Sequence, residues 1–123
     1  MQLSLELPFP PSVNHIWVPR KPKGMRRSDR YLQWIQEADQ LFLTQKRSLG
    51  NHMLMGKYNC LLELVAPDNR RRDGSNYFKA PEDFAVRVGL MKDDSMCEKG
   101  TFLWIRDSGG PLYGCRFTIW DIE

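Results

Sequence analysis

The feature that most constrains the fold is a long amphipathic pattern in residues 29–48. Apolar side chains recur there at spacings of three and four positions, which is the period of one helix face. Ser28 is a suitable N-cap just before the pattern, and Gly50 with Asn51 ends it. The predicted buried face consists of Tyr31, Trp34, Ile35, Ala38, Leu41, Phe42 and Gln45. We therefore expect a long helix here that packs with one side against a sheet.

Strands are predicted on both sides of this helix. Residues 3–7 alternate apolar and polar side chains, and the prolines that follow exclude a helix there. Residues 58–66 form an apolar run typical of a strand buried on both faces. Residues 101–106 and 113–120 suggest a final hairpin joined by a turn at 107–111. Their alternating pattern, Phe102-Trp104 and Phe117-Ile119, could belong to the core or to a dimer face.

A second helix is predicted to begin near Asp73 or Ser75 and to end near Val88, with Gly89 as its stop. Pro81 lies within this range, so either the helix bends there or it begins later.

These elements predict one α+β domain over residues 1–123, in the order β-α-β-α-β-β, with two helices packed on a small mixed sheet. The cysteines are Cys60, Cys97 and Cys115, widely spaced and odd in number, which favours reduced thiols. There is no signal peptide pattern and no long apolar run. We therefore expect a cytoplasmic protein with no membrane partner.

Positive charge is concentrated in two segments, although the net charge is only +3. Residues 70–72 are three successive arginines, and residues 20–30 contain a single acid, Asp29, among their basic side chains. Trp17 and Tyr31 flank the second segment, so we interpret it as a mobile loop that contacts nucleic acid rather than a merely solubilising one. The loop cations in question are Lys21, Lys23, Arg26 and Arg27.

The second helix could carry metal-dependent chemistry on phosphate. Helical spacing predicts that Asp73, Asn76, Ala80 and Asp83 share one face, with Lys79 at its border. Carboxylates hold Mg²⁺, and clustered arginines beside a helix start attract phosphate. The alternative is structural: Asp73 caps a helix, Asp93-Asp94 forms a turn, and the arginines are solvated.

The chain resembles the RusA-type Holliday junction resolvases, which are small dimeric endonucleases of bacteria and their phages. Residues 7–14 resemble the family's proline-rich signature ending in Ser-x-Asn, and residues 67–76 resemble its basic run leading into Asp-x-Asp-Asn. Lys79 follows at the family's lysine spacing, and residues 89–94 resemble its Gly-apolar-x-x-Asp-Asp segment.

The resemblance implies an α+β homodimer that binds four-way DNA junctions and nicks them symmetrically with Mg²⁺ or Mn²⁺, with no small-molecule substrate. It implies a bacterial cell or a phage-infected host cell as the location. By position, Asp73 and Asp94 would be metal-binding catalytic acids and Lys79 the catalytic lysine. The implied DNA contacts are Arg70, Arg71, Arg72, Asn76 and Asn14, in addition to the loop cations.

Ser75 departs from the family pattern, because the family has a second metal-binding aspartate at this position. A neutral hydroxyl is a poor Mg²⁺ ligand, so one negative charge is missing. Asp93 or Asp83 could compensate for it. Two alternatives therefore stand beside the nuclease: a non-catalytic junction-binding protein on the same scaffold, and a protein-interaction domain whose basic loop is incidental.

Overall fold

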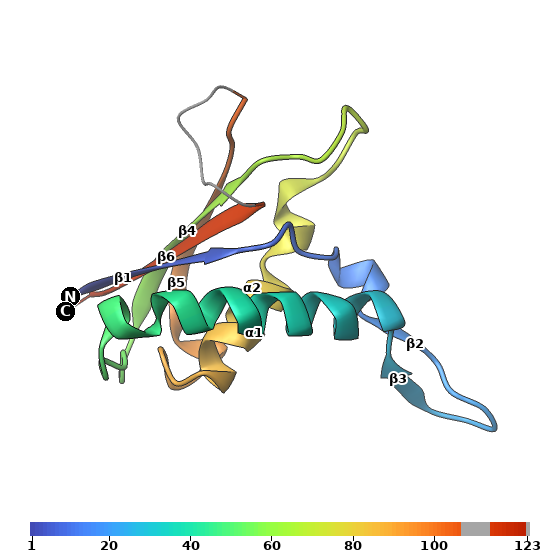
Figure 1. Cartoon of the computed structure of the whole chain (residues 1–123), viewed down its shortest axis with the longest axis horizontal. Helices are drawn as coiled ribbons and strands as arrows, with labels where there is room; N and C mark the ends of the chain where they lie inside the picture. The colour runs from blue at the N-terminus through green and yellow to red at the C-terminus, as the bar shows by residue number, and fades with distance from the viewer. Residues whose placement is uncertain (107–113, 123) are drawn as a thin grey trace.

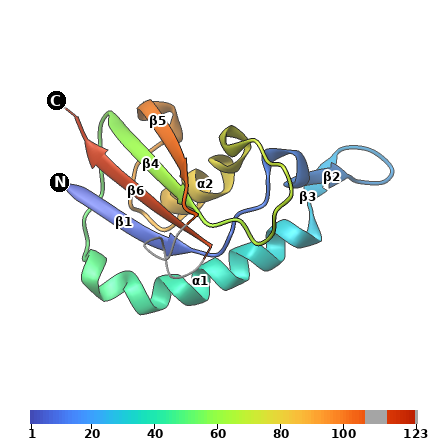
Figure 2. The ribbon, with the colours of Figure 1, turned by 90° about the horizontal axis from the view of Figure 1, so that it is seen from above.

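The main sheet of the computed structural model, which describes residues 1–106 and 114–122, is mixed and lies over two helices (Figure 1). Its described strands are β1 (Gln2–Leu7), β4 (Tyr58–Leu64), β5 (Cys97–Trp104) and β6 (Cys115–Asp121), in the spatial order β1-β6-β4-β5. β6 is antiparallel to both β1 and β4, whereas β5 is parallel to β4. Figure 2 shows these strands side by side, with α1 running along the β1 side of the sheet. The predicted α+β class, with two helices on a small mixed sheet, is confirmed.

The predicted final hairpin is wrong, because β4 lies between β5 and β6. β4 pairs along its whole length with β6, from Tyr58 opposite Asp121 to Leu64 opposite Cys115. Turn-forming residues between two strands indicate a reversal of the chain but do not show which strand becomes the neighbour. The predicted turn at 107–111 and Tyr113 lie outside the described residues.

One face of the sheet is buried. Every second residue of β4 is fully buried, and the residues between them are only partly covered, so β4 is not buried equally on both faces as predicted. Phe117 and Ile119 of β6 are buried and belong to the core, whereas Phe102 on the outer strand β5 is 40% exposed. Of these alternating residues, Phe117 and Ile119 therefore lie in the core, and Phe102 lies at the surface.

Helix α1 (Asp29–Leu49) begins and ends as the sequence predicts. The Tyr31 backbone N–H donates to the Ser28 hydroxyl at 3.0 Å, and Gly50 ends the helix with a positive φ of 68°. Tyr31, Trp34 and Ala38 are buried, as the apolar spacing predicts.

Gln45, the polar member of the predicted buried face, joins α1 to the outer strand β1. Its side-chain oxygen accepts from the Glu6 backbone N–H at 2.7 Å, and its amide nitrogen donates to the Glu6 carbonyl at 2.8 Å. Because β1 is an edge strand, these groups have no neighbouring strand to pair with. The Gln45 side chain of the helix therefore satisfies the outward-facing N–H and carbonyl of Glu6 at the edge of the sheet.

The second helix begins later than its earliest predicted start. A short 3-10 helix, η2 (Gly74–Tyr77), comes first, and α2 (Lys79–Arg87) follows it. Pro81 thus falls in the first turn of α2, where the missing N–H costs little. Because the helix starts at Lys79, Ala80 is fully buried rather than on the predicted polar face. Gly89, with a φ of 84°, follows the helix end as predicted.

A short hairpin replaces the predicted mobile loop. β2 (Trp17–Pro19) pairs with β3 (Met25–Arg27), after the 3-10 helix η1 (Val13–His15), and the hairpin projects away from the body of the molecule (Figure 1). Its turn is closed by a hydrogen bond from the Arg20 N–H to the Gly24 carbonyl at 2.9 Å. Strands of three residues are too short to show a period-two pattern in the sequence.

The three cysteines are free thiols in the structure. The sulfur atoms of Cys60 on β4 and Cys97 on β5 lie 3.8 Å apart. Among the helices of residues 1–106 and 114–122, none is long and apolar enough to cross a membrane.

Gly114, at the start of β6, is predicted to tolerate no side chain. A Cβ atom there would collide with the backbone nitrogen of Phe9. We expect Gly114→Ala to lower the free energy of unfolding by about 1–3 kcal/mol or more, as in overpacked cores. Urea unfolding followed by circular dichroism measures this loss. Gly56→Ala is the matched control, because a Cβ atom at Gly56 meets open space; an equal loss in both variants would contradict the steric explanation.

Candidate nucleic-acid interface

A cleft of about 530 Å³ lies where the hairpin, the start of α1 and α2 come together. Its floor is apolar, because Trp34 of α1 and Phe84 of α2 pack edge to face with ring centroids 5.9 Å apart. Its rim carries both signs of charge. The charged lining residues are Arg27, Lys79, Arg87, Lys92, Asp83, Asp93 and Asp94. Two of the predicted catalytic residues, Lys79 and Asp94, are therefore in this cleft.

Lys79 bridges two of these acids. Its Nζ atom lies 3.1 Å from Asp83 Oδ1 and 3.2 Å from Asp94 Oδ2. The hydrogen bond to Asp83, one turn further along α2, raises the pKa of Lys79, and the bond to Asp94 adds to this effect. The structure thus joins Lys79 to Asp94, 15 positions away in the sequence, and keeps the lysine charged.

Tyr58 and Glu82 lie behind Asp94. The Tyr58 hydroxyl donates to Glu82 Oε2 at 3.0 Å and lies 3.5 Å from the Asp94 carbonyl oxygen. Burial, together with the neighbouring Glu82 carboxylate, raises the pKa of Tyr58. Burial is also the main cause that raises the pKa of Glu82, and the Asp94 carboxylate adds to it. The turn that contains Asp94 therefore packs against Tyr58 of β4.

Asp93 stabilises a turn, which is the structural alternative considered for Asp93-Asp94 in the sequence. Its Oδ1 atom accepts from the Ser95 N–H at 3.0 Å and caps the 3-10 helix η3 (Asp94–Met96). This hydrogen bond lowers the pKa of Asp93. Its carboxylate is exposed at the cleft rim, and its role as a metal ligand stays a prediction.

Asp73 and Ser75 form a closed turn of their own. Asp73 Oδ1 accepts from the Ser75 N–H at 3.2 Å and from the Ser75 hydroxyl at 2.9 Å. Gly74 between them is buried against the ring of Phe102. Asp73, Ser75 and Asn76, all described, are not among the residues that line the cleft. The predicted single polar face is therefore divided into a Lys79–Asp83–Asp94 group and an Asp73–Ser75 turn.

Asn14 lies in η1, which packs against η2, the 3-10 helix that follows Asp73. The side chain of Asn14 is exposed.

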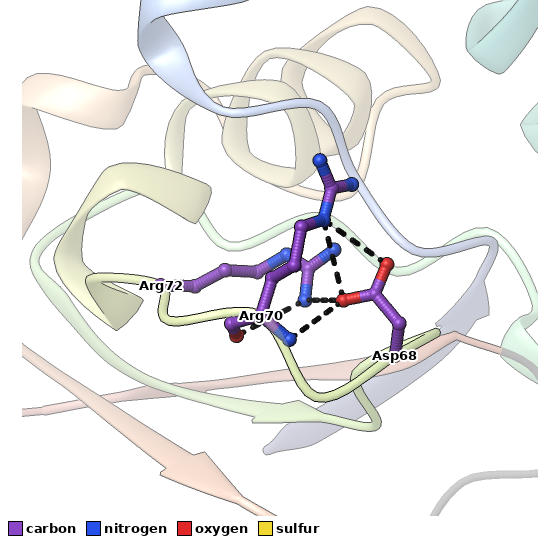
Figure 3. Close-up of polar contacts among 3 residues, drawn as sticks. All are labelled: Asp68, Arg70 and Arg72. Atoms are coloured by element: carbon purple, nitrogen blue, oxygen red, sulfur yellow. Dashed lines mark hydrogen bonds and ion pairs between the residues drawn. The ribbon is translucent and has the colours of Figure 1, made fainter.

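The three arginines line a second hollow, of about 220 Å³, together with Arg106 and Asp68. Figure 3 shows Arg70 and Arg72 both reaching the carboxylate of Asp68. Arg72 donates to Asp68 at 2.8 Å, and Arg70 lies 3.2 Å from the same carboxylate. These contacts, led by the hydrogen bond from Arg72, hold the pKa of Asp68 below its usual range. The two hollows share no described lining residue.

The arginines of this run differ in their surroundings. The Arg72 side chain is only 9% exposed, and its guanidinium lies 5.4 Å from the centroid of the Phe9 ring. Arg71 is exposed, and no hydrogen bond or ion pair joins its side chain to another described residue. Arg72 thus holds its loop against the body, while Arg71 faces solvent; that either of them contacts DNA stays a prediction.

The hairpin presents the predicted loop cations. Lys21, Lys23 and Arg26 are exposed, and Arg26 pairs with Asp29 at 3.2 Å. Arg27 lies over the ring of Tyr31 at 5.8 Å and reaches the cleft.

Two cations of the cleft, Arg87 and Lys92, were not predicted as site residues. Lys92 directly precedes Asp93-Asp94, which is a signal that could have found it. Arg87 pairs with Asp39 of α1 and stacks on Phe84, contacts that depend on the packing of the two helices.

The predicted metal ligands offer oxygen donors of the type that Mg²⁺ prefers. Asp73 and Asp94 each present a carboxylate that is partly open to solvent. Within the described ranges, no three His, Cys, Asp or Glu side chains are grouped so that they could hold a metal ion. The donor chemistry fits Mg²⁺ with one or two protein carboxylates, completed by water and phosphate oxygens.

Comparison with models of known protein families and with curated proteins gives no match for this chain.

Arg71 and Arg72 are predicted to differ in how much their substitution lowers stability. Arg72→Ala removes a covered ion pair and a cation–π contact, so we expect a loss of about 1–2 kcal/mol in the free energy of unfolding. Arg71→Ala is the matched neighbour, and its stability should change by less than about 0.5 kcal/mol. Thermal and urea unfolding of both variants measure the difference. Equal stability of the two would contradict the structural role of Arg72.

Glu82 is predicted to make stability depend on pH. A carboxyl with a raised pKa in the folded state binds its proton more tightly than in the unfolded chain, so stability falls as pH rises through the unfolded value of about 4.3. Glu82→Gln cannot ionise, and its amide oxygen still accepts from Tyr58. The stability of this variant relative to the unaltered protein should therefore be greater at pH 7 than at pH 3. Urea unfolding across this range measures it, and the opposite trend would show a lowered pKa.

Proposed function

We propose that this protein is a Mg²⁺-dependent endonuclease that binds four-way DNA junctions and nicks them symmetrically. The observation that carries the proposal is the contact between Lys79 and Asp94 in a cleft rimmed by further cations. A lysine held beside a carboxylate, with cations around it, suits a site where a phosphate must be bound and its developing negative charge stabilised. The similarity of the motifs to those of the RusA-type resolvases supplies the substrate.

In this proposal the residues divide the work. The family resemblance assigns Asp73 and Asp94 as the metal ligands, and a metal ion bound there would polarise the scissile phosphate and favour attack by hydroxide. Lys79 would donate to the phosphate oxygens, and Asp83 would keep its ammonium in position. Arg71 and the hairpin cations Lys21 and Lys23 would contact the DNA backbone, which fixes position without reading sequence.

A homodimer in the cytoplasm of a bacterial or phage-infected cell completes the proposal. A four-way junction has approximate two-fold symmetry, and two protomers related by a two-fold axis would present one site to each of two equivalent strands.

A second candidate is a junction-binding protein that does not cut. Two observations favour it. The Ser75 hydroxyl, where the family has a carboxylate, donates to Asp73 at 2.9 Å. Lys79 pairs with both Asp83 and Asp94 and offsets part of their negative charge. The two candidates share the same DNA surface and differ only in the metal site.

The assay that tests the proposal is nicking of a labelled four-way junction in Mg²⁺. We expect slow, symmetric nicking by the unaltered protein, and an increase of at least about tenfold in Ser75→Asp, since substitution of residues that hold or support a metal ion commonly changes metal affinity or activity by about 10–100-fold. Asp94→Asn should abolish nicking in both backgrounds while junction binding persists in gel shifts.

The matched control is Glu98→Gln, which removes an exposed acid on β5 that lies outside the cleft. Its nicking should equal that of the unaltered protein. Binding without nicking in every variant would identify the non-catalytic alternative. Absence of any salt-sensitive binding to branched DNA would overturn both candidates.

A further inference from the structure

Trp17 presents a large aromatic surface inside the cleft. Its side chain is 49% exposed, whereas Trp34 and Phe84 in the floor are buried. An indole ring exposed in a cleft gains nothing from the protein core, but it can stack on a flat ligand.

The cations of the cleft are not all engaged. Lys79 is paired with Asp83 and Asp94, and Arg87 is paired with Asp39. Within the part of the chain that the structure describes, Arg27 and Lys92 form no ion pair within 4.0 Å. These two cations can therefore bind an anion without breaking an existing contact.

The stacking surface and one of these cations are presented together. Trp17 and Arg27 are directly opposed partners in the β2–β3 hairpin, so their side chains leave the same face of the ribbon. Arg27 is held over the ring of Tyr31 at the start of α1. The hairpin thus offers a flat apolar ring and a positive charge side by side, at the mouth of the cleft that contains Asp94.

We propose that this cleft holds a single unpaired nucleotide of a DNA strand, with its base stacked on Trp17 and its phosphate bound by Arg27 and Lys92. A volume of about 530 Å³ lies within the range of small-ligand sites, about 300–1,000 Å³. Stacking accepts any base, so the site would recognise an unpaired state rather than a sequence. The inference rests on the proposed DNA substrate and adds that an unstacked nucleotide is the part recognised beside Lys79 and Asp94.

The test compares three labelled DNA duplexes that differ at one position. The first is fully paired, the second has one bulged adenosine, and the third has a bulged abasic residue, which keeps the phosphate and the flexibility but lacks the base. Dissociation constants are measured by fluorescence anisotropy in EDTA, so that no strand is cut. We expect the bulged adenosine to bind about tenfold more tightly than the abasic bulge, as stacking on one aromatic ring allows.

Trp17→Ala should reduce this ratio to about one, and Trp17→Phe should retain most of it, since a phenyl ring still stacks. Met25→Ala is the matched control: Met25 is an exposed apolar residue of the same hairpin that does not line the cleft, and its ratio should be unchanged. Circular dichroism checks that each variant is folded. A ratio near one in the unaltered protein, or an unchanged ratio in Trp17→Ala, would overturn the inference.

Because the assay needs no cleavage, its result is independent of the nicking assay. A protein that nicks junctions but shows no preference for the bulged base loses only this inference, whereas a protein that shows the preference but never nicks loses only the proposed cleavage.

Discussion

The contact between Trp34 and Phe84 is the interaction on which the rest of this structure depends. It joins α1 to α2 beneath the sheet and forms the floor of the cleft. The Trp34 indole also donates to the Pro8 carbonyl at 3.0 Å, which ties the exit of β1 to the same point. This contact thus gives the hairpin side and the α2 side of the cleft a common support.

The sequence correctly predicted those elements whose ends are marked by local capping residues. Ser28 and Gly50 mark α1 because a cap and a positive φ act within one turn of the helix. The same reasoning failed for the final strands, since nothing near residues 101–120 records that β4 lies between them. The position of β4 is set by burial of its alternate side chains, which is a property of the assembled sheet.

The candidate site was predictable in part for a similar reason. Lys79 and Asp94 could be named from their spacing and from the family resemblance, and the structure places them in contact. The predicted common face of Asp73 and Asp83 did not form, because Pro81 and the Asp73–Ser75 turn delay the start of α2 until Lys79. The contact of Arg72 with Phe9 could not be recognised from the sequence, since the two residues are distant in the sequence and only the fold brings them together.

Helix α1 is a rigid connection between the edge of the sheet and the hairpin. At one end Gln45 grips the backbone of β1, and at the other the Ser28 hydroxyl donates to the His15 carbonyl at 2.6 Å, just before the hairpin. Its 21 residues span about 30 Å at 1.5 Å per residue. The distance and the angle at which the hairpin is carried are therefore fixed by the length of one helix, and a single inserted residue would turn everything beyond it by about 100°. The orientation of the hairpin relative to the cleft thus depends on the number of residues between Ser28 and Gln45.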